Sequence, residues 1–319
     1  MSATPLRVPF AGGLTDLKEY VVSHGGATIS TTIDKKIYVG IKPNTDGYFS
    51  LKYLDVHEKV NVVDDIRHDH IRETLRISSL DNTPVDVYIM ADLNAESGLG
   101  SSGALTVGLL NAMHALNKES VSKTTLLEEA SHIEVELLGG ASGYHDMAIA
   151  AVGGLNLIEY ATPGIMYRQV RSSPGAIQGV FDRLLFLYNG RHYKSKPSLD
   201  ILAAKIDEAG EVLSQMKSLA YETEKALMEN DLEGFGKCIQ KQQDLKQQLP
   251  GMFTDGFVTD VVARVRKHGA YVQLPGGKIG SFLMVFCPDG QQEVIKREFP
   301  DMHEVAIGPS EDGSRITEI

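Results

Sequence analysis

Hydrophobic and polar residues alternate along residues 27–42, as they do in a pair of half-buried β-strands. Residues 48–63 have the same β character. The pattern predicts further strands at 85–92, 153–160, 182–190, 281–290 and 303–309. It predicts helices at 67–80, 104–117, 123–140, 198–231, 232–249, 255–270 and 291–299. Because strands and helices are intermixed without a regular βαβα order, we expect an α+β fold.

The length of the chain and its turn residues indicate two domains. At 319 residues the chain can build two hydrophobic cores of ordinary size. Two Pro-Gly steps fall within residues 162–176, and such steps mark turns and linkers. We therefore expect one domain at residues 1–165 and a second at residues 166–319. In the second domain, Asp231 is expected to cap the helix at 232–249.

Composition and charge restrict the class of partner. Hydrophobic residues make up 42% and charged residues 23%, which is the balance of a soluble globular protein. The net charge of −11 argues against a broad nucleic-acid-binding face or an anionic-membrane surface. No apolar run reaches the roughly 18 residues of a membrane span. A small anionic ligand is still compatible, because a helix N-terminus and a few cations can hold one.

Two features favour a cytoplasmic location. Cys238 and Cys287 are the only cysteines, too few for a disulfide framework or a cysteine-rich zinc site, so a reducing compartment fits best. The first residues lack the basic start and the long apolar core of a signal peptide.

The candidate chemistry is concentrated in residues 97–104, SGLGSSGA, where glycines and serines precede an apolar helix. The letters satisfy the dinucleotide-binding pattern GxGxxG, but that motif directly follows a strand and has an acidic residue about 20 positions later on a second strand. Neither condition holds here, and the Gly-Lys-Ser/Thr of a Walker loop is absent. A plain glycine-rich turn with a serine cap is one interpretation. The other is a polyphosphate cradle, because Ser101 and Ser102 lie at a helix start with free N–H groups and a positive dipole end.

The segment GLGSSGALTVGLLNAMHAL closely resembles the second signature of the GHMP small-molecule kinases, the superfamily of galactokinase, homoserine kinase and mevalonate kinase. TPLRVPFAGGLTDLKEY resembles the first signature of the branch that phosphorylates heptose 7-phosphates at the anomeric hydroxyl, to which L-fucose kinases are related. RHDHIRETL, HIEVELLGGASGYHDMAIAAVGGLNLIEY and GAYVQLPGGKIGSFLMVF are similar to a helix start, the catalytic segment and a third glycine-rich motif. The resemblance implies a two-domain fold, with a ribosomal-protein-like N-terminal domain, a ferredoxin-like C-terminal domain and an active site in the cleft between them.

The resemblance also implies roles for individual residues. The phosphates of ATP would be wrapped by Gly98, Leu99, Gly100, Ser101, Ser102 and Gly103. Ser102 and Glu134 would hold Mg²⁺, with Glu136 ranked lower, and Asp146 would be the catalytic aspartate that faces the acceptor hydroxyl. Arg7 would either neutralise the transferred group or orient Asp146. The acceptor side would comprise Gly12, Gly13, Asp16, Tyr144, His145, Gly276, Gly277 and Lys278.

The chain departs from the heptose-phosphate branch in three places. That branch reads Gly-Lys-Gln-Asp where residues 143–146 read GYHD, so a permanent cation is lost unless His145 is protonated near neutral pH. The third motif has fewer glycines, and Gln273 stands at the position of an upstream Lys. The basic residues of the loop 191–194, which are Arg191, His192 and Lys194, either receive a substrate phosphate or lie in solvent. Residues 67–70, RHDH, are not expected to bind a metal, because adjacent residues rarely converge on one ion.

The resemblance therefore implies an ATP- and Mg²⁺-dependent kinase that phosphorylates the anomeric hydroxyl of a sugar phosphate, above all a heptose 7-phosphate. One alternative is a kinase of an unphosphorylated sugar or another small alcohol, such as L-fucose or galactose. The other is a non-catalytic nucleotide- or sugar-binding member of the fold. In each case the partner is a small molecule, and a homodimer is compatible with the pattern without being required by it.

Overall fold

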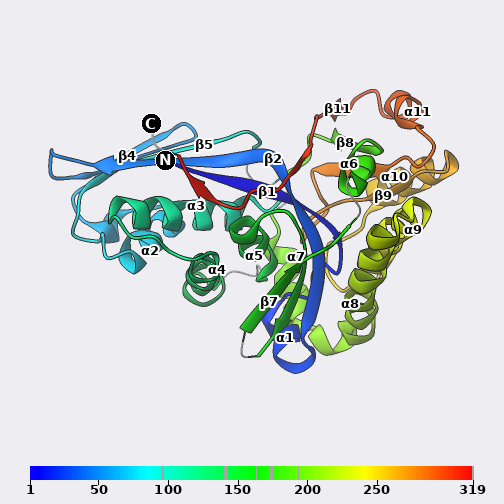
Figure 1. The fold of residues 1–319 in the computed structure, drawn as a ribbon, viewed down its shortest axis with the longest axis horizontal. Coiled ribbons are helices and arrows are strands. Elements are labelled where there is room, and N and C mark those ends of the chain that lie inside the picture. Colours follow the sequence, from blue (N-terminus) through cyan, green and yellow to red (C-terminus); the bar gives the residue numbers. More distant parts are fainter. Residues whose placement is uncertain (95–96, 140–142, 163, 173–174, 193, 318–319) are drawn as a thin grey trace.

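The computed structural model of the chain describes residues 1–94, 97–139, 143–162, 164–172, 175–192 and 194–317. They form two β-sheets with helices packed against them (Figure 1). The larger sheet has the order β13-β1-β2-β5-β3-β4, with β6 and β12 also paired to β2, and β7 paired to β6. Its strands are β1 (Ser2–Ala11), β2 (Gly26–Pro43), β3 (Phe49–Tyr53), β4 (Val56–Val60), β5 (Val85–Ala91), β6 (Leu155–Ala161), β7 (Gly164–Gln169), β12 (Pro309–Ser310) and β13 (Arg315–Ile316).

Strand β2 connects the two ends of this sheet. It pairs with β1 along most of its length, with β6 in its first part and with β5 in its last part. Residues 26–33 of β2 are buried on both faces, and alternation of buried and exposed positions begins only after them. The prediction of a strand pair at 27–42 is therefore wrong. With neither glycine nor proline between residues 27 and 39, nothing breaks the strand there.

Helices cover β1 and β2 from two sides (Figure 1). One group comprises α2 (Asp69–Ile77), α3 (Ser101–Leu116), α4 (Lys123–Ser131) and α5 (His145–Val152). In this group α3 and α5 contact β1 and β2, and α2 and α4 pack against them. The other group, α8 (Ile206–Glu229) and α9 (Leu232–Lys246), lies to the right of β2 in Figure 1. The shorter helices are α1 (Lys18–His24), the 3-10 helix η1 (Val63–Asp65), the π-helical turn η2 (His132–Leu137), α6 (Ala176–Phe181) and α7 (Lys196–Ala204).

The smaller sheet is antiparallel and has the order β11-β8-β10-β9. Its strands are β8 (Leu184–Tyr188), β9 (Tyr271–Gln273), β10 (Phe282–Phe286) and β11 (His303–Glu304). The core of this part joins these strands to α10 (Gly256–Lys267) and α11 (Gln292–Glu298) through buried aliphatic side chains such as Leu187, Val262 and Leu283. Helix α9 lies along β9, so that it contacts both sheets.

Most expected elements are present, and the α+β class is confirmed. Asp231 caps α9 as predicted, by accepting a hydrogen bond from Gly234 N. The helix expected at 198–231 is broken at Lys205 into α7 and α8, and the strand expected at 303–309 is reduced to β11 and the first residue of β12. Elements that were not predicted include α1, β1, α6, β9 and β13. Strand β7 lies within the expected junction, so the boundary at residue 165 falls inside a strand and stays a prediction. Residue 140, at the end of an expected helix, and residues 163 and 173–174 of the junction lie outside the described residues.

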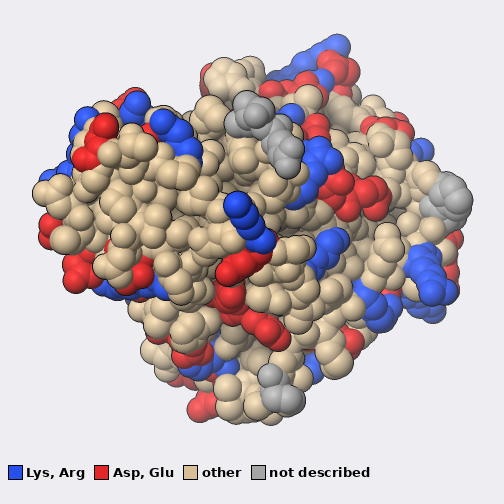
Figure 2. Space-filling view, turned by 60° about the vertical axis from the view of Figure 1, so that its left-hand side comes forward, with Lys and Arg blue, Asp and Glu red and all other residues tan. Residues whose placement is uncertain are grey.

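The surface and the helices add two observations on possible partners. Figure 2 shows acidic and basic side chains interspersed over one face of the molecule, with other residues dominating the area. Within the described part of the chain, no helix combines the length and the hydrophobicity needed to cross a bilayer. Cys238 and Cys287 are both buried and free.

Candidate active site

The glycine-rich turn is fastened to β1 at the start of α3. Helix α3 begins at Ser101, directly after Gly100, whose φ of +81° lies in the left-handed region that favours glycine. A Cβ on Gly100 would lie 2.9 Å from Arg7 Cγ, so a side chain there would displace the arginine. Leu99 is buried, and its carbonyl accepts a hydrogen bond from Arg7 N at 3.0 Å. The turn therefore fixes the position of the arginine as well as that of the helix start.

Arg7 and Asp146 form an ion pair at the centre of the site. Arg7 Nε and Nη2 both donate to Asp146 Oδ1, at 2.9 and 2.7 Å, and Nη1 donates to Gly98 O at 2.8 Å. Burial alone would raise the pKa of Asp146, but the charge and hydrogen bonds of Arg7 outweigh it and lower the pKa. Gly103 of α3 packs directly on this residue, because a Cβ there would lie 2.6 Å from Asp146 Cβ. Of the two roles considered for Arg7, the contact favours orientation of an ionised Asp146.

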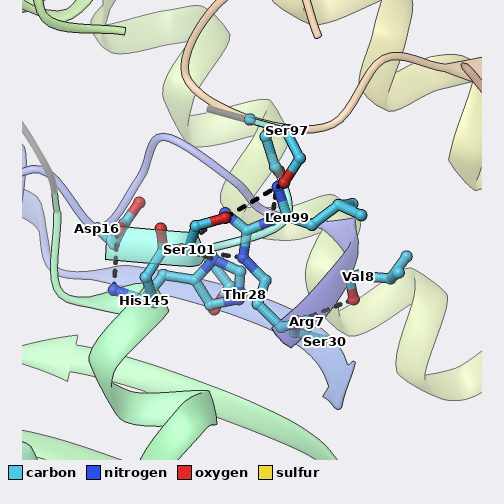
Figure 3. Close-up of polar contacts among 12 residues, drawn as sticks. Arg7, Val8, Asp16, Thr28, Ser30, Ser97, Leu99, Ser101 and His145 are labelled. Atoms are coloured by element: carbon cyan, nitrogen blue, oxygen red, sulfur yellow. Dashed lines mark hydrogen bonds and ion pairs between the residues drawn. The ribbon is translucent and has the colours of Figure 1, made fainter. Parts of the chain in front are cut away.

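Asp16 and His145 lie close to Arg7 (Figure 3), and His145 Nδ1 is 3.6 Å from Asp146 Oδ1. Asp16 Oδ2 accepts a hydrogen bond from His145 N at 3.0 Å. Burial raises the pKa of Asp16 to about 6, although the His145 N–H opposes the shift. Burial also lowers the pKa of His145 to about 3, and the positive charge of Arg7 acts in the same direction. The lowered pKa disfavours a charged His145 near neutral pH, and so argues against the alternative in which His145 replaces the missing cation.

Ser102 and Glu134 converge on one point, as predicted for metal ligands. Ser102 Oγ donates to Glu134 Oε1 at 2.6 Å, and Thr106 Oγ1 donates to the same oxygen at 2.7 Å. Glu134 is buried in the π-helical turn η2, and such turns are frequent at functional sites. Glu136 instead forms an exposed ion pair with Lys18 at 2.6 Å. The geometry therefore favours Glu134 over Glu136.

His70 is a member of this cluster that the sequence did not reveal. Its Nε2 lies 3.1 Å from Glu134 Oε1 and 3.2 Å from Ser102 Oγ. Burial alone would lower the pKa of His70, but the hydrogen bond and charge of Glu134 outweigh it, and the pKa is raised. His68 lies next to His70, because its ring packs edge-on against both Tyr53 and His70. The helical spacing of the apolar positions in α2 is the sequence signal that could have placed His70 on the face toward α3.

The cluster has the ligand types that suit one kind of metal site. Mg²⁺ prefers hard oxygen ligands and is usually bound through one or two carboxylates together with substrate phosphates. Ser102 and Glu134 supply a hydroxyl and a carboxylate, so they fit an ion that ATP would bring and largely hold. Among the described residues, no group of three or more His, Cys, Asp or Glu side chains could hold a metal by itself.

Two neighbouring cavities meet at the Arg7–Asp146 pair. The larger is lined by Gly98, Gly100, Ser101, Ser102 and Lys278, and by apolar residues that include Ile37, Leu54, Ile89 and Met90. The smaller is lined by Gly13, Leu14, Asp16, His145, Gln243 and Gln273, among others. Five residues line both: Arg7, Asp146, Ser195, Gly276 and Gly277. Lys278, expected on the acceptor side, thus lines the larger cavity.

Three polar residues of α9, Gln242, Gln243 and Lys246, line the smaller cavity, and the sequence did not reveal them. Gln240 lies on the same helix outside this lining. Gln240 and Gln243 accept hydrogen bonds from the backbone N–H groups of Val272 and Leu274, at 3.2 and 3.0 Å. Lys246 Nζ donates to the carbonyl oxygens of residues 274, 276 and 278, each at 2.7 Å. Burial lowers the pKa of Lys246 to about 7, and the charges of Arg7 and Lys278 contribute. The polar face of α9 is therefore buried against the third glycine-rich motif.

The remaining acceptor-side candidates are not all brought together. Gly12 N donates to Gln242 Oε1 at 3.0 Å, which ties the first motif to α9. Tyr144 stacks on Tyr160, with 6.4 Å between ring centroids, and does not belong to the lining of either cavity described above. In the basic loop, Arg191 lies over the ring of Phe257 and 3.7 Å from Asp255, while Tyr188 and His192 share a hydrogen bond. None of the loop's three predicted residues lines these cavities.

Comparisons with known proteins agree on one family. Residues 66–154 match the family model described as GHMP kinases N terminal domain. The chain is 22% identical to a mevalonate kinase of Methanothermobacter thermautotrophicus, covering 87% of this chain and 88% of the relative. It is also 22% identical to the D-glycero-alpha-D-manno-heptose 7-phosphate kinase of Campylobacter jejuni, with 92% and 91% covered. Among solved structures, a D-glycero-D-manno-heptose 1-phosphate kinase from Bacteroides thetaiotaomicron superimposes with a TM-score of 0.81 at 19% identity, over 99% of both chains.

Proposed function

We propose that this chain, a small-molecule kinase of the GHMP family, transfers the γ-phosphate of ATP to a hydroxyl group of a sugar or sugar phosphate. The observation that carries the proposal is the position of Arg7 and Asp146, which line both cavities at the point where these meet. A nucleotide in the larger cavity and an acceptor in the smaller one would bring their reacting groups together beside this ion pair.

The larger cavity has the features that a nucleoside triphosphate needs. Its apolar side chains, such as Ile37, Ile89 and Met90, suit the faces of an adenine ring. Ser101 and Ser102 belong to the first turn of α3, where unpaired N–H groups and the helix dipole favour phosphate oxygens. Bound between Ser102, Glu134 and the phosphates, Mg²⁺ would supply positive charge that offsets the charge developing on the transferred group.

In the proposed reaction the acceptor oxygen forms a bond to the γ-phosphorus, the bond to the β-phosphate oxygen breaks, and ADP leaves. Phosphoryl transfer of this kind depends mostly on positioning and charge neutralisation. Asp146, held ionised by Arg7, would accept the hydrogen bond of the acceptor hydroxyl and fix its direction. The hydroxyl proton would then pass to this carboxylate as the new bond forms. Asp16, whose pKa is raised to about 6, would bind another hydroxyl of the acceptor.

Two acceptors are supported by different observations. A heptose 7-phosphate is supported by the relative from Campylobacter jejuni, whose name states this substrate. Transfer to its anomeric hydroxyl is supported by the resemblance of the sequence motifs. An unphosphorylated sugar, such as galactose or L-fucose, is supported by the basic loop: Arg191 faces Asp255 and Phe257, and the Tyr188–His192 hydrogen bond engages His192 away from the cavities. Because these loop residues are not among the described lining of the smaller cavity, they do not supply the predicted binding site for a substrate phosphate there.

The test is ADP release in the presence of Mg²⁺, with heptose 7-phosphate, galactose, L-fucose and mevalonate as acceptors. Asp146→Asn should lower turnover by about 100-fold or more with the best acceptor. Glu136→Gln is the matched control, because this carboxylate is exposed and paired with Lys18. Tight ATP binding without turnover on any acceptor would indicate the non-catalytic alternative, and unchanged turnover in Asp146→Asn would remove the role given to that residue.

A further inference from the structure

Three residues that line the smaller cavity each carry a buried polar atom with no hydrogen-bond partner in the described part of the chain. The atoms are His145 Nε2, Gln243 Nε2 and Gln273 Oε1. Leaving a buried polar atom unpaired is unfavourable, so nearly all such atoms in native proteins have a partner. Three of them around one cavity indicate a ligand that carries hydrogen-bonding groups.

The backbone fixes which atom each glutamine presents to the cavity. Gln243 Oε1 accepts from Leu274 N–H, so the amide nitrogen is the atom left over, and it is a donor. Gln273 Nε2 donates to Pro9 O, so the amide oxygen is left over, and it is an acceptor. Neither amide can be turned over without losing a backbone hydrogen bond. The residues that line the cavity therefore hold one donor and one acceptor, each of fixed identity and without a partner among the described residues.

The cations that line the same cavity are engaged by the protein itself. Lys246 has three N–H donors, and three backbone carbonyl oxygens accept from them. Arg7 is bound to Asp146 and to Gly98 O. A carboxylate or phosphate entering the cavity would have to compete for these groups, whereas a hydroxyl can donate to Gln273 and accept from Gln243 without disturbing them.

We propose that Gln243 and Gln273 are specificity residues that bind hydroxyl groups of the acceptor. The part of the acceptor that enters the smaller cavity is an uncharged, polyhydroxylated part of a sugar, and any phosphate it carries lies outside this cavity. This inference rests on the proposed function and names the chemistry of its acceptor. It favours sugars over mevalonate, whose carboxylate would meet two amides and two engaged cations.

The experiment compares Gln243→Met with Gln240→Met. Both glutamines lie on the same face of α9 and each accepts a hydrogen bond from a β9-side backbone N–H, so the structural loss is matched. Gln240 differs because its Nε2 donates to Asp244 and the residue does not line the cavity. Initial rates are measured with galactose, L-fucose, heptose 7-phosphate and mevalonate, at varied acceptor and varied ATP. Binding is measured separately, from the shift in thermal unfolding that each compound causes in the presence of ADP.

With the best sugar acceptor, Gln243→Met should raise the acceptor KM by about 10-fold or more, while Gln240→Met leaves it near the wild-type value. The KM for ATP should change little in both. Equal changes in the acceptor KM for the two variants would overturn the inference, as would mevalonate being the best acceptor.

Turnover and binding separate the two ideas. If ADP is released with none of the four compounds, the proposed function is wrong. The shifts in thermal unfolding then still test whether Gln243 contributes to sugar binding. Stabilisation by a sugar that Gln243→Met abolishes and Gln240→Met retains would support the inference. Absence of stabilisation by all four compounds would overturn it.

Discussion

The contact between Gly103 and Asp146 provides the sharpest test of how the site is positioned. A Cβ at residue 103 would lie 2.6 Å from Asp146 Cβ and 2.8 Å from Met147 N, whereas ordinary van der Waals contacts begin near 3.4 Å. Because two of the opposing atoms belong to the backbone of α5, Gly103→Ala has to push α3 and α5 apart by about 1 Å, and overpacking of this kind costs about 1–3 kcal/mol. The gain of about 1 kcal/mol from replacing a helical glycine offsets part of this cost.

The larger effect should be on activity. A displacement of about 1 Å in a catalytic constellation can lower the rate by about 100-fold, and here it separates Asp146 from the helix start that would hold the phosphates. The assay is kcat/KM for ADP release, together with the free energy of unfolding in urea. Gly210→Ala is the matched control, because Gly210 also lies inside a helix, α8, with no atom within 4 Å of the added Cβ. It should be as active as the wild type and as stable or slightly more stable. If Gly103→Ala behaves like Gly210→Ala in both assays, close packing of α3 on α5 does not position Asp146.

Three further predictions concern the metal, the pH and the third motif. Glu134→Gln should raise the Mg²⁺ concentration for half-maximal activity by about 10-fold or more, and an unmoved activation curve would exclude Glu134 as a ligand. His114 lies 2.6 Å from Glu119 and 2.7 Å from Glu129, and these carboxylates outweigh burial and raise its pKa. Their stabilisation is therefore complete below the ordinary histidine pKa and is lost as the pH rises through the raised one, so the stability deficit of His114→Gln in urea should shrink from pH 6 to pH 9. Lys246→Met leaves three buried carbonyl groups without their donor and should lower the free energy of unfolding by about 3–5 kcal/mol, and a loss below about 1 kcal/mol would contradict the role given to that ammonium group.

The sequence predicted those elements whose period or capping residues are local. Helix α3, the Asp231 cap of α9 and the strands β5, β8 and β10 follow from such patterns. Strand β1 was missed because all ten of its residues are buried, including serine, threonine and arginine, so it shows no alternation of polar and apolar positions. Strand β9 has only three residues, too few to show a period, and β13 pairs with β1 at the other end of the chain, which a local pattern does not contain.

The candidate site likewise has residues that the sequence predicted and residues that it did not. Ser102, Glu134, Asp146 and Arg7 were predicted because a family resemblance fixes their spacing, and the structure brings them to one region. The glutamines of α9 were missed because a row of Gln and Lys on a helix normally faces solvent. Their burial depends on the backbone groups of β9 that they meet, and these are absent from the helix sequence itself. The lowered pKa of His145 likewise depends on burial and on Arg7, which is 138 positions away in the sequence.

Among the described residues, no strand pairs with the outer edge of β9, and side chains of α9 supply hydrogen bonds there instead. In the proposed function, the same helix face would both complete the sheet and select the acceptor. A mutation at residue 243 that changed selectivity would also remove one of these hydrogen bonds, and exposed sheet edges invite aggregation. A change of substrate in the evolution of this protein would consequently have to be accompanied by a compensating change in β9 or its surroundings.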